Sequence, residues 1–300
     1  MTQANCFRAL LRRDGMIVAP GAYDGITAKL IQQAGFAAVY MTGAGTAATL
    51  GYPDFGLVTM SEMVTNARRI VAAVEIPVIA DADTGYGNQL NVVRTVREYE
   101  ISGVAGIHIE DQGFPKKCGH LDDKEIVPRE DWLEKIRAAA NCRRDHEFVI
   151  IARTDARAVL GFEEAVARAN AALSAGADMA FVEAPQTMEE VAAVPRLVRG
   201  PCLLNVVRGG KTPDLDLLQA EAMGYKLAIV PGLLMKSVIG VCEIALSELR
   251  TTHRHPAPIK EMTVREMFER VGASEWDALR GNSDRGRAQR LIGISPSPPC

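Results

Sequence analysis

Carboxylate side chains recur where short apolar runs of the sequence end. Asp81 and Asp83 follow one such run, Glu110 and Asp111 follow the next, and Glu183 follows a later one. Carboxylates brought together repel one another and are costly to desolvate unless a hard cation lies among them. Because the candidate ligands are all oxygen atoms, Mg²⁺ suits this set better than Zn²⁺. One carboxylate at such a position is often only a helix cap, but agreement across several strands favours a metal site.

A second chemical signal is the segment GFPKKCGH, residues 113–120, which is long enough to arch over a site beside it. Its cysteine, Cys118, follows two lysines and precedes His120 by two positions. This positive setting predicts a lowered thiol pKa and proton exchange near neutral pH. A lone loop cysteine is more often inert. The 6 cysteines of the chain include no CxxC pair, which argues against a disulfide framework and a zinc site.

Eight short apolar runs supply the strands on which these residues would sit: 16–19, 37–42, 76–82, 106–111, 148–154, 179–184, 202–206 and 227–232. Apolar residues recur at helical spacing over 24–34, 89–102, 130–141, 162–175 and 215–223. This alternation predicts an α/β protein with a parallel sheet covered on both faces. Eight units favour a closed (β/α)₈ TIM barrel over an open doubly wound sheet. Active sites of that barrel lie at the carboxyl ends of the strands, where Thr42, Arg153, Asp155 and Asn205 would join the carboxylates.

Two glycine-containing segments resemble phosphate-binding loops only weakly. Residues 43–48 read GAGTAA after a strand, but Pro53 follows too soon for a full helix, so 43–59 is expected to be a loop whose N–H groups approach a substrate carboxylate. Residues 210–212 read GKT, but Asn205 stands where a nucleotide-binding loop has glycine, and Pro213 interrupts the expected helix.

Composition bounds the domain organisation and the partners. The sequence predicts a barrel catalytic domain over 1–250, a C-terminal helical extension over 251–294 and a disordered Pro- and Ser-rich tail over 295–300. The net charge of −3 comes from interspersed acidic and basic residues, which argues against nucleic acid or a membrane as partner. No apolar stretch approaches the roughly 18 residues of a membrane span, and no secretory signal is recognisable, so we expect a soluble, cytoplasmic protein.

Eight motifs together resemble the isocitrate lyase and phosphoenolpyruvate mutase superfamily over about residues 16–249. They are PGAYD (20–24), GYPDFG (51–56), DADTGYGN (81–88), IEDQ (109–112), KKCGH (116–120), ARTDA (152–156), VEAP (182–185) and N-x4-G-x-TP (205–213). The cysteine of KKCGH makes the chain resemble the lyase branch of the superfamily, because the phosphonate branches lack this cysteine. Within that branch the chain is similar to 2-methylisocitrate lyase, 2,3-dimethylmalate lyase and the plant petal death protein.

The resemblance implies a carbon–carbon lyase that splits a 2-hydroxy di- or tricarboxylate into a 2-oxoacid such as pyruvate and a carboxylate such as succinate or propionate. It implies Mg²⁺, with Mn²⁺ as a substitute, bound directly by Asp81 and through water by Asp54, Asp83 and Glu110. Cys118 would be the general acid, and Tyr40 a candidate base or a packed core residue. The residues implied to contact the substrate are Thr42, Gly43, Ala44, Lys117, Gly119, His120, Arg153, Glu183 and Asn205.

Some alternatives stay open at this point. Arg208 stands where the family usually carries glutamate, which leaves the substrate undecided. The rivals are hydrolysis of oxaloacetate to oxalate and acetate, a carboxyphosphonoenolpyruvate or phosphoenolpyruvate mutase-type reaction, a non-catalytic barrel and a nucleotide-dependent oxidoreductase. The family commonly forms a tetramer that exchanges its last barrel helix between subunits, which implies an oligomeric role for 233–249 and for the segment beyond Pro258.

Overall fold

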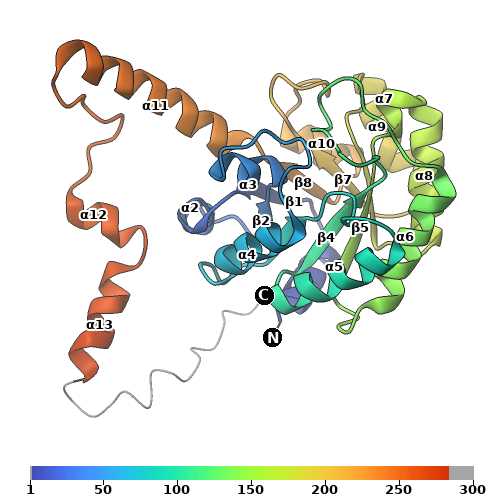
Figure 1. The fold of residues 1–300 in the computed structure, drawn as a ribbon, viewed down its shortest axis with the longest axis horizontal. Helices are drawn as coiled ribbons and strands as arrows, with labels where there is room; N and C mark the ends of the chain where they lie inside the picture. Colours follow the sequence, from blue (N-terminus) through green and yellow to red (C-terminus); the bar gives the residue numbers. More distant parts are fainter. Residues whose placement is uncertain (1, 284–300) are drawn as a thin grey trace. The chain divides into compact units, whose positions relative to one another are not determined.

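A closed barrel of eight parallel strands forms the core of the part of the chain up to Leu233 (Figure 1). The computed structural model describes residues 2–283. Each strand pairs with the next along the chain, and the first pairs with the last, in parallel register. The strands are β1 (Ile17–Ala22), β2 (Val39–Met41), β3 (Val78–Asp81), β4 (Gly106–Glu110), β5 (Val149–Thr154), β6 (Met179–Val182), β7 (Cys202–Asn205) and β8 (Leu227–Val230). The predicted eight-stranded barrel is confirmed.

Helices between the strands cover the outside of the barrel (Figure 1). They are α2 (Gly25–Gln33), α3 (Gly43–Thr49), α4 (Met60–Val71), α5 (Gln89–Ser102), α6 (Arg129–Cys142), α7 (Ala156–Val159), α8 (Phe162–Ser174), α9 (Met188–Leu197) and α10 (Leu217–Met223). The helical segments predicted from apolar spacing correspond to α2, α5, α6, α8 and α10. Asp24, Thr59, Asn88 and Asp216 begin their helices with capping boxes, which satisfy two otherwise unpaired backbone donors at each start.

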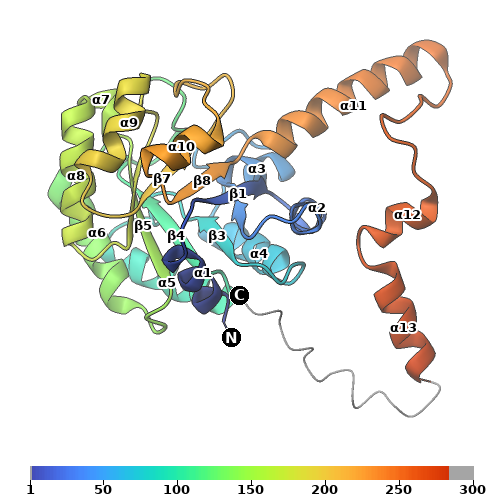
Figure 2. The same cartoon turned by 180° about the vertical axis from the view of Figure 1, so that it is seen from behind.

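Among the helices outside the predicted segments, α1 and α3 alter the expected arrangement of the barrel ends. Helix α1 (Gln3–Arg12) buries Phe7 in the core of the barrel, and Arg8 donates to backbone carbonyls beside the start of β5, so α1 closes the amino end (Figure 2). The expectation of a loop directly after β2 is wrong because residues 43–49 form α3. Thr42 caps that helix by accepting a hydrogen bond from the N–H of Gly45, and two turns are complete before Pro53.

Alternation along the strands separates the core from the polar end of the barrel. Side chains two positions apart share a face, so a buried apolar layer lies directly below a polar layer. The lower layer includes Tyr40, Ile79, Ile151, Phe181 and Leu203. Two positions later on the same strands come Thr42, Asp81, Arg153, Glu183 and Asn205. Each large core side chain stabilises the fold by about 1.5–3 kcal/mol, and the layer positions the polar residues above it.

The chain divides into two compact units after Leu233. The second unit contains most of α11 (Leu233–Thr252), with α12 (Val264–Glu269) and α13 (Ala273–Ser283). The sequence predicts a boundary at residue 250; the units separate earlier because no residue of α11 is buried. The end of the predicted extension, 284–294, and the predicted tail, 295–300, lie outside the described residues. Over residues 2–283, no helix has both the length and the apolarity needed to cross a membrane.

Candidate active site

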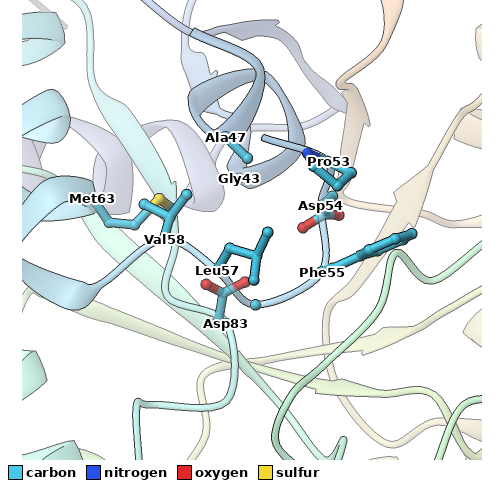
Figure 3. Close-up of a pocket in the computed structure, with 10 residues that line it drawn as sticks. Gly43, Ala47, Pro53, Asp54, Phe55, Leu57, Val58, Met63 and Asp83 are labelled. Atoms are coloured by element: carbon cyan, nitrogen blue, oxygen red, sulfur yellow. The ribbon is translucent and has the colours of Figure 1, made fainter. Parts of the chain in front are cut away.

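Four carboxylates and one lysine gather at the carboxyl ends of β3 and β4, and we call this set the inner cluster: Asp54, Asp81, Asp83, Glu110 and Lys116. The Lys116 Nζ atom lies 2.7 Å from Asp54 Oδ1 and 2.7 Å from Asp83 Oδ1. Asp83 adopts a left-handed φ of 46° and donates its N–H to Asp81 Oδ1 at 3.0 Å. Figure 3 shows Asp54 and Asp83 on the wall of one small pocket, which Gly43 also lines. The structure therefore brings together all the predicted metal ligands.

Burial and mutual repulsion shift the pKa values in this cluster. Burial raises the pKa of Asp83 to about 6 against the opposing charge of Lys116, and Asp81 adds to the increase. Burial also raises the pKa of Glu110 well above its ordinary value, although Arg153 opposes it. Burial would raise the pKa of Asp81 as well, but His108, Lys116 and Arg153 outweigh it and lower that pKa. The carboxylates outnumber the cations beside them, so the site favours additional positive charge.

The donor set of the inner cluster fits a hydrated divalent cation. Glu110 Oε1 is buried and has no hydrogen-bond partner among the described residues. Buried acceptors are normally paired, and water bound to Mg²⁺ would supply such donors. In the described part of the chain, no three acidic, histidine or cysteine side chains converge to ligate one ion directly.

Tyr40 and His108 form the floor below Asp81. The Tyr40 hydroxyl lies 2.9 Å from His108 Nε2 and 3.4 Å from Asp81 Oδ2. Burial raises the pKa of Tyr40 and lowers that of His108 to about 4, so both side chains are neutral near pH 7. Sequence reasoning missed His108, although it stands two positions before Glu110 on β4 and therefore shares its face.

The start of α3 lies against the inner cluster. Gly43 donates its N–H to Asp81 Oδ2 at 3.2 Å. A Cβ atom at Gly43 would lie only 2.3 Å from that oxygen, so only glycine allows this approach. Thr42 is buried and Ala44 half-buried on either side of Gly43. The three residues predicted to contact a substrate carboxylate thus border the predicted metal site.

A second group of predicted residues meets at the ends of β5, β6 and β7. Arg153 Nη1 lies 2.9 Å from Glu110 Oε2, which joins this group to the inner cluster. His120 Nε2 lies 2.9 Å from Glu183 Oε1, and Asn205 Nδ2 donates to both oxygens of Glu183 at 3.2 Å. The N–H of Lys211 donates to His120 Nδ1 at 3.0 Å, which assigns the proton of a neutral His120 to Nε2.

The segment 113–127, which we call the lid, carries Cys118. The predicted lowering of the thiol pKa is wrong: burial raises the pKa of Cys118, helped by the charges of Asp54 and Glu183. The neighbouring lysines do not offset this effect because Lys116 bridges two aspartates, while the Lys117 ammonium donates to the Asp123 carbonyl at 3.1 Å. The Lys117 ammonium therefore points away from the site and does not stabilise a thiolate at Cys118. The thiol keeps its proton near pH 7.

Gly119 brings the lid backbone into contact with the rest of the site. A Cβ atom there would lie 2.5 Å from Arg153 Nη2 and 2.6 Å from Glu183 Cγ. Sequence reasoning placed Lys116 beside the thiol rather than on Asp54 and Asp83, and it did not single out Lys124, because the direction of a lysine side chain cannot be deduced from a loop sequence. Arg208 is exposed in the loop that follows β7.

Comparisons with known proteins agree with this geometry. The family model described as phosphoenolpyruvate phosphomutase matches residues 7–250. The 2,3-dimethylmalate lyase of Eubacterium barkeri is 52% identical over 282 residues, which cover 94% of this chain and 95% of that protein. A structure of oxaloacetate acetylhydrolase with the inhibitor 3,3-difluorooxalacetate has a TM-score of 0.89 and 39% identity, covering 95% of this chain and 97% of that one. A phosphonopyruvate hydrolase in complex with oxalate and Mg²⁺ has a TM-score of 0.86 and 31% identity, covering 95% and 100%.

Proposed function

Since the chain belongs to the phosphoenolpyruvate mutase/isocitrate lyase superfamily, as a carbon–carbon lyase of that group, we propose that it cleaves the C2–C3 bond of a 2-hydroxy di- or tricarboxylate. The substrate would be of the 2,3-dimethylmalate or 2-methylisocitrate type, and the products a 2-oxoacid such as pyruvate and a carboxylate such as propionate or succinate. The observation that carries the proposal is the position of Cys118 on the lid directly before Gly119, whose backbone lies against Arg153 and Glu183. The raised pKa of the buried thiol agrees with this role.

Mg²⁺ or Mn²⁺ would be held by Asp81, with Asp54, Asp83 and Glu110 binding its waters. The bound ion would polarise the 2-hydroxy group and the carboxylate next to it. The excess of carboxylates over cations and the unpaired Glu110 oxygen support this assignment.

The residues at the start of α3 and on the later strands would bind and orient the substrate. Thr42, Gly43 and Ala44, with the guanidinium of Arg153, would hold the carboxylate of the 2-oxoacid half. The other half would lie against Gly119, His120, Glu183 and Asn205. Glu183 already connects His120 and Asn205 through its carboxylate, and Gly119 packs against it. Removal of the hydroxyl proton by Tyr40 stays a prediction. Because the raised pKa keeps the phenol protonated, Tyr40 would accept that proton only after passing its own to His108 Nε2, which lies 2.9 Å away.

Cys118 would supply the proton that the departing fragment needs. When the C2–C3 bond breaks, its electron pair stays on C3, and the thiol donates its proton to that carbon. A raised thiol pKa favours this role because the acid is fully protonated before the reaction. The closed lid would exclude water, so the carbanionic carbon meets the thiol first. Solvent would return the proton to the thiolate after product release.

Product analysis tests the proposed function. Release of pyruvate, glyoxylate, oxalate and acetate should be followed with Mg²⁺ and 2,3-dimethylmalate, 2-methylisocitrate, isocitrate or oxaloacetate. Release of a 2-oxoacid from one of the first three would support the lyase and identify its substrate. The likeness to oxaloacetate acetylhydrolase supports hydrolysis of oxaloacetate as the second candidate function. Oxalate and acetate formed from oxaloacetate alone would favour that activity and overturn the first.

We also infer that the chain forms a homotetramer with exchange of α11 between subunits. The helix exposes Val238, Ile239, Ile244 and Leu246, and a row of exposed apolar side chains indicates a surface that another chain covers. Light scattering after size-exclusion chromatography should give four times the mass of the 32.4 kDa chain. A monomeric mass would contradict the inference. The cytoplasmic location stays a prediction.

A further inference from the structure

Lys124 is a buried lysine that connects two parts of the site without joining the inner cluster. Only 1% of its side chain is exposed, and its Nζ atom lies 2.8 Å from Asp155 Oδ1. The same ammonium donates to the backbone carbonyl of Gly119. A buried ammonium is costly unless it is paired and hydrogen-bonded. Both requirements are met here, so Lys124 ties one residue of the lid to one residue at the end of β5.

Asp155 is held in place independently of Lys124. Its carboxylate accepts hydrogen bonds from Arg153 Nε at 3.0 Å and from Arg153 Nη2 at 3.2 Å. Its backbone N–H donates to Asp111 Oδ1 at 2.8 Å. Asp155 is completely buried. The position of Asp155 on the barrel is therefore fixed. Lys124, itself a residue of the lid, connects the lid to it and also holds the Gly119 carbonyl within the lid.

The lid residue that Lys124 contacts is the one beside the thiol. Gly119 follows Cys118 directly and lies so close to Arg153 and Glu183 that a Cβ atom would not fit. The Gly119 carbonyl belongs to the peptide bond to His120, one residue beyond Cys118, so holding it helps to fix the segment that carries the thiol. Other contacts hold the lid on both sides of Gly119: Lys116 pairs with Asp54 and Asp83, and His120 contacts Glu183 and the loop after β7. Lys124 is the lid residue that holds the Gly119 carbonyl itself.

We propose that Lys124 is a positioning residue: it holds the Gly119 carbonyl to Asp155 and thereby keeps the lid closed, with the segment that carries Cys118 against Arg153 and Glu183. Lys124 acts through Gly119, so its role is positional rather than catalytic. The consequence for turnover rests on the proposed function, in which Cys118 is the acid. The consequence for lid closure rests on geometry alone and is measurable without a substrate.

Alkylation of Cys118 by iodoacetamide measures lid closure directly, because an open lid exposes the thiol. The rate at each cysteine is followed by peptide mass spectrometry of the full chain, and Cys142 serves as internal reference because α6 ends at the opposite end of the barrel. Lys124→Met should raise the rate at Cys118 about tenfold, in proportion to the loss of a charged hydrogen bond. Lys124→Arg, which keeps the charge, should restore a rate close to that of the wild type. The rate at Cys142 should not change.

Lys226→Met is the matched control, because that ammonium also donates to a backbone carbonyl, of Gly15 at 2.9 Å, but lies beside the start of β8. It should leave alkylation of Cys118 unchanged. If Lys124→Met does not fold, Lys124→Gln, which also removes the charge, provides the same test. Wild-type alkylation of Cys118 in a folded, uncharged variant would overturn the proposal and leave Lys124 a purely structural role. Once a lyase substrate is established, Lys124→Met should lower kcat about tenfold with little change in KM. The alkylation test needs no substrate, so a failure of the lyase proposal can be distinguished from a failure of the proposed role of Lys124.

Discussion

Glu110 and Asp111 are neighbours at the end of β4, both completely buried, yet their surroundings differ. Asp111 accepts hydrogen bonds from Thr154 Oγ1 at 2.6 Å, from the N–H of Asp155 at 2.8 Å and from Arg168 Nη1 at 3.1 Å. Glu110 lies on the opposite face of the chain, and its Oε1 atom has no donor in the described part of the chain. The comparison teaches that the outward carboxylate is fully paired and supports the fold, whereas the inward one is left available to a ligand.

The largest expected effect is a loss of turnover on substitution of Cys118, whose lid covers the site that Glu110 faces. Cys118→Ser should lower turnover by about 10²–10⁴-fold, the range that one general acid contributes. Binding of Mg²⁺ and of pyruvate should stay near the wild-type values, because Cys118 belongs to neither the inner cluster nor the start of α3. Steady-state kinetics and calorimetric titration measure the two quantities. Full activity in the variant would refute the acid assignment.

On the outward side, Asp111→Ala should destabilise the fold without changing the inner cluster. The substitution leaves Arg168 Nη1 with the Val127 carbonyl, at 2.9 Å, as its remaining hydrogen-bond partner. Breaking a buried pair in this way costs about 3 kcal/mol of unfolding free energy. Urea denaturation monitored by circular dichroism measures the loss. A free energy of unfolding equal to that of the wild type would show that the outward pairing contributes nothing to stability.

The raised pKa of Asp111 also predicts how the free energy of unfolding depends on pH. Burial raises this pKa to about 6, despite hydrogen bonds that oppose the increase, while the unfolded value is about 4. The folded state therefore binds this proton more tightly, and the stabilisation is complete below about pH 4 and lost as the pH rises through 6. In Asp111→Asn the free energy of unfolding should vary by about 2 kcal/mol less than in the wild type between pH 4 and 7. Parallel pH profiles for the two proteins would contradict the assignment.

Glu110→Gln should give the smallest effect and a result opposite in kind to that at Asp111. Removing the under-paired inward charge should weaken Mg²⁺ binding about tenfold, as expected for a group that orients a metal-bound water. The free energy of unfolding should change by less than about 1 kcal/mol, because the amide oxygen of the variant can still accept from Arg153 Nη1, which lies 2.9 Å from Glu110 Oε2. Titration of Mg²⁺ and urea denaturation would be compared on the same preparation. A large loss of stability with unchanged Mg²⁺ affinity would reverse the roles assigned to the two neighbours.

The barrel and its polar end follow from the sequence because apolar runs and the residues that end them are local features. Asp81, Glu110, Arg153, Glu183 and Asn205 each end such a run, and the structure brings them together as predicted. Helix α1 was not predicted, because its role depends on Phe7 filling the far end of the closed barrel, a contact that no local pattern encodes.

The lid shows where sequence reasoning ends. The sequence Lys-Lys-Cys predicts a lowered thiol pKa only if both ammonium groups face the sulfur. In the fold, Lys116 faces two aspartates and Lys117 faces a backbone carbonyl, so burial decides the sign of the shift. The directions of long side chains in a loop depend on distant partners, and for the same reason Lys124 could not be assigned a role from its neighbours in the chain.

Titration of Mg²⁺ into Asp81→Ala and Asp111→Ala, side by side with the wild type, tests most directly whether the inward carboxylates form the metal site. The wild type should bind Mg²⁺ at one site, Asp111→Ala should keep that affinity, and Asp81→Ala should lose at least about 100-fold, since it removes the proposed direct ligand. Equal affinity in the two variants would contradict the division of roles between the inward and outward faces of the barrel strands.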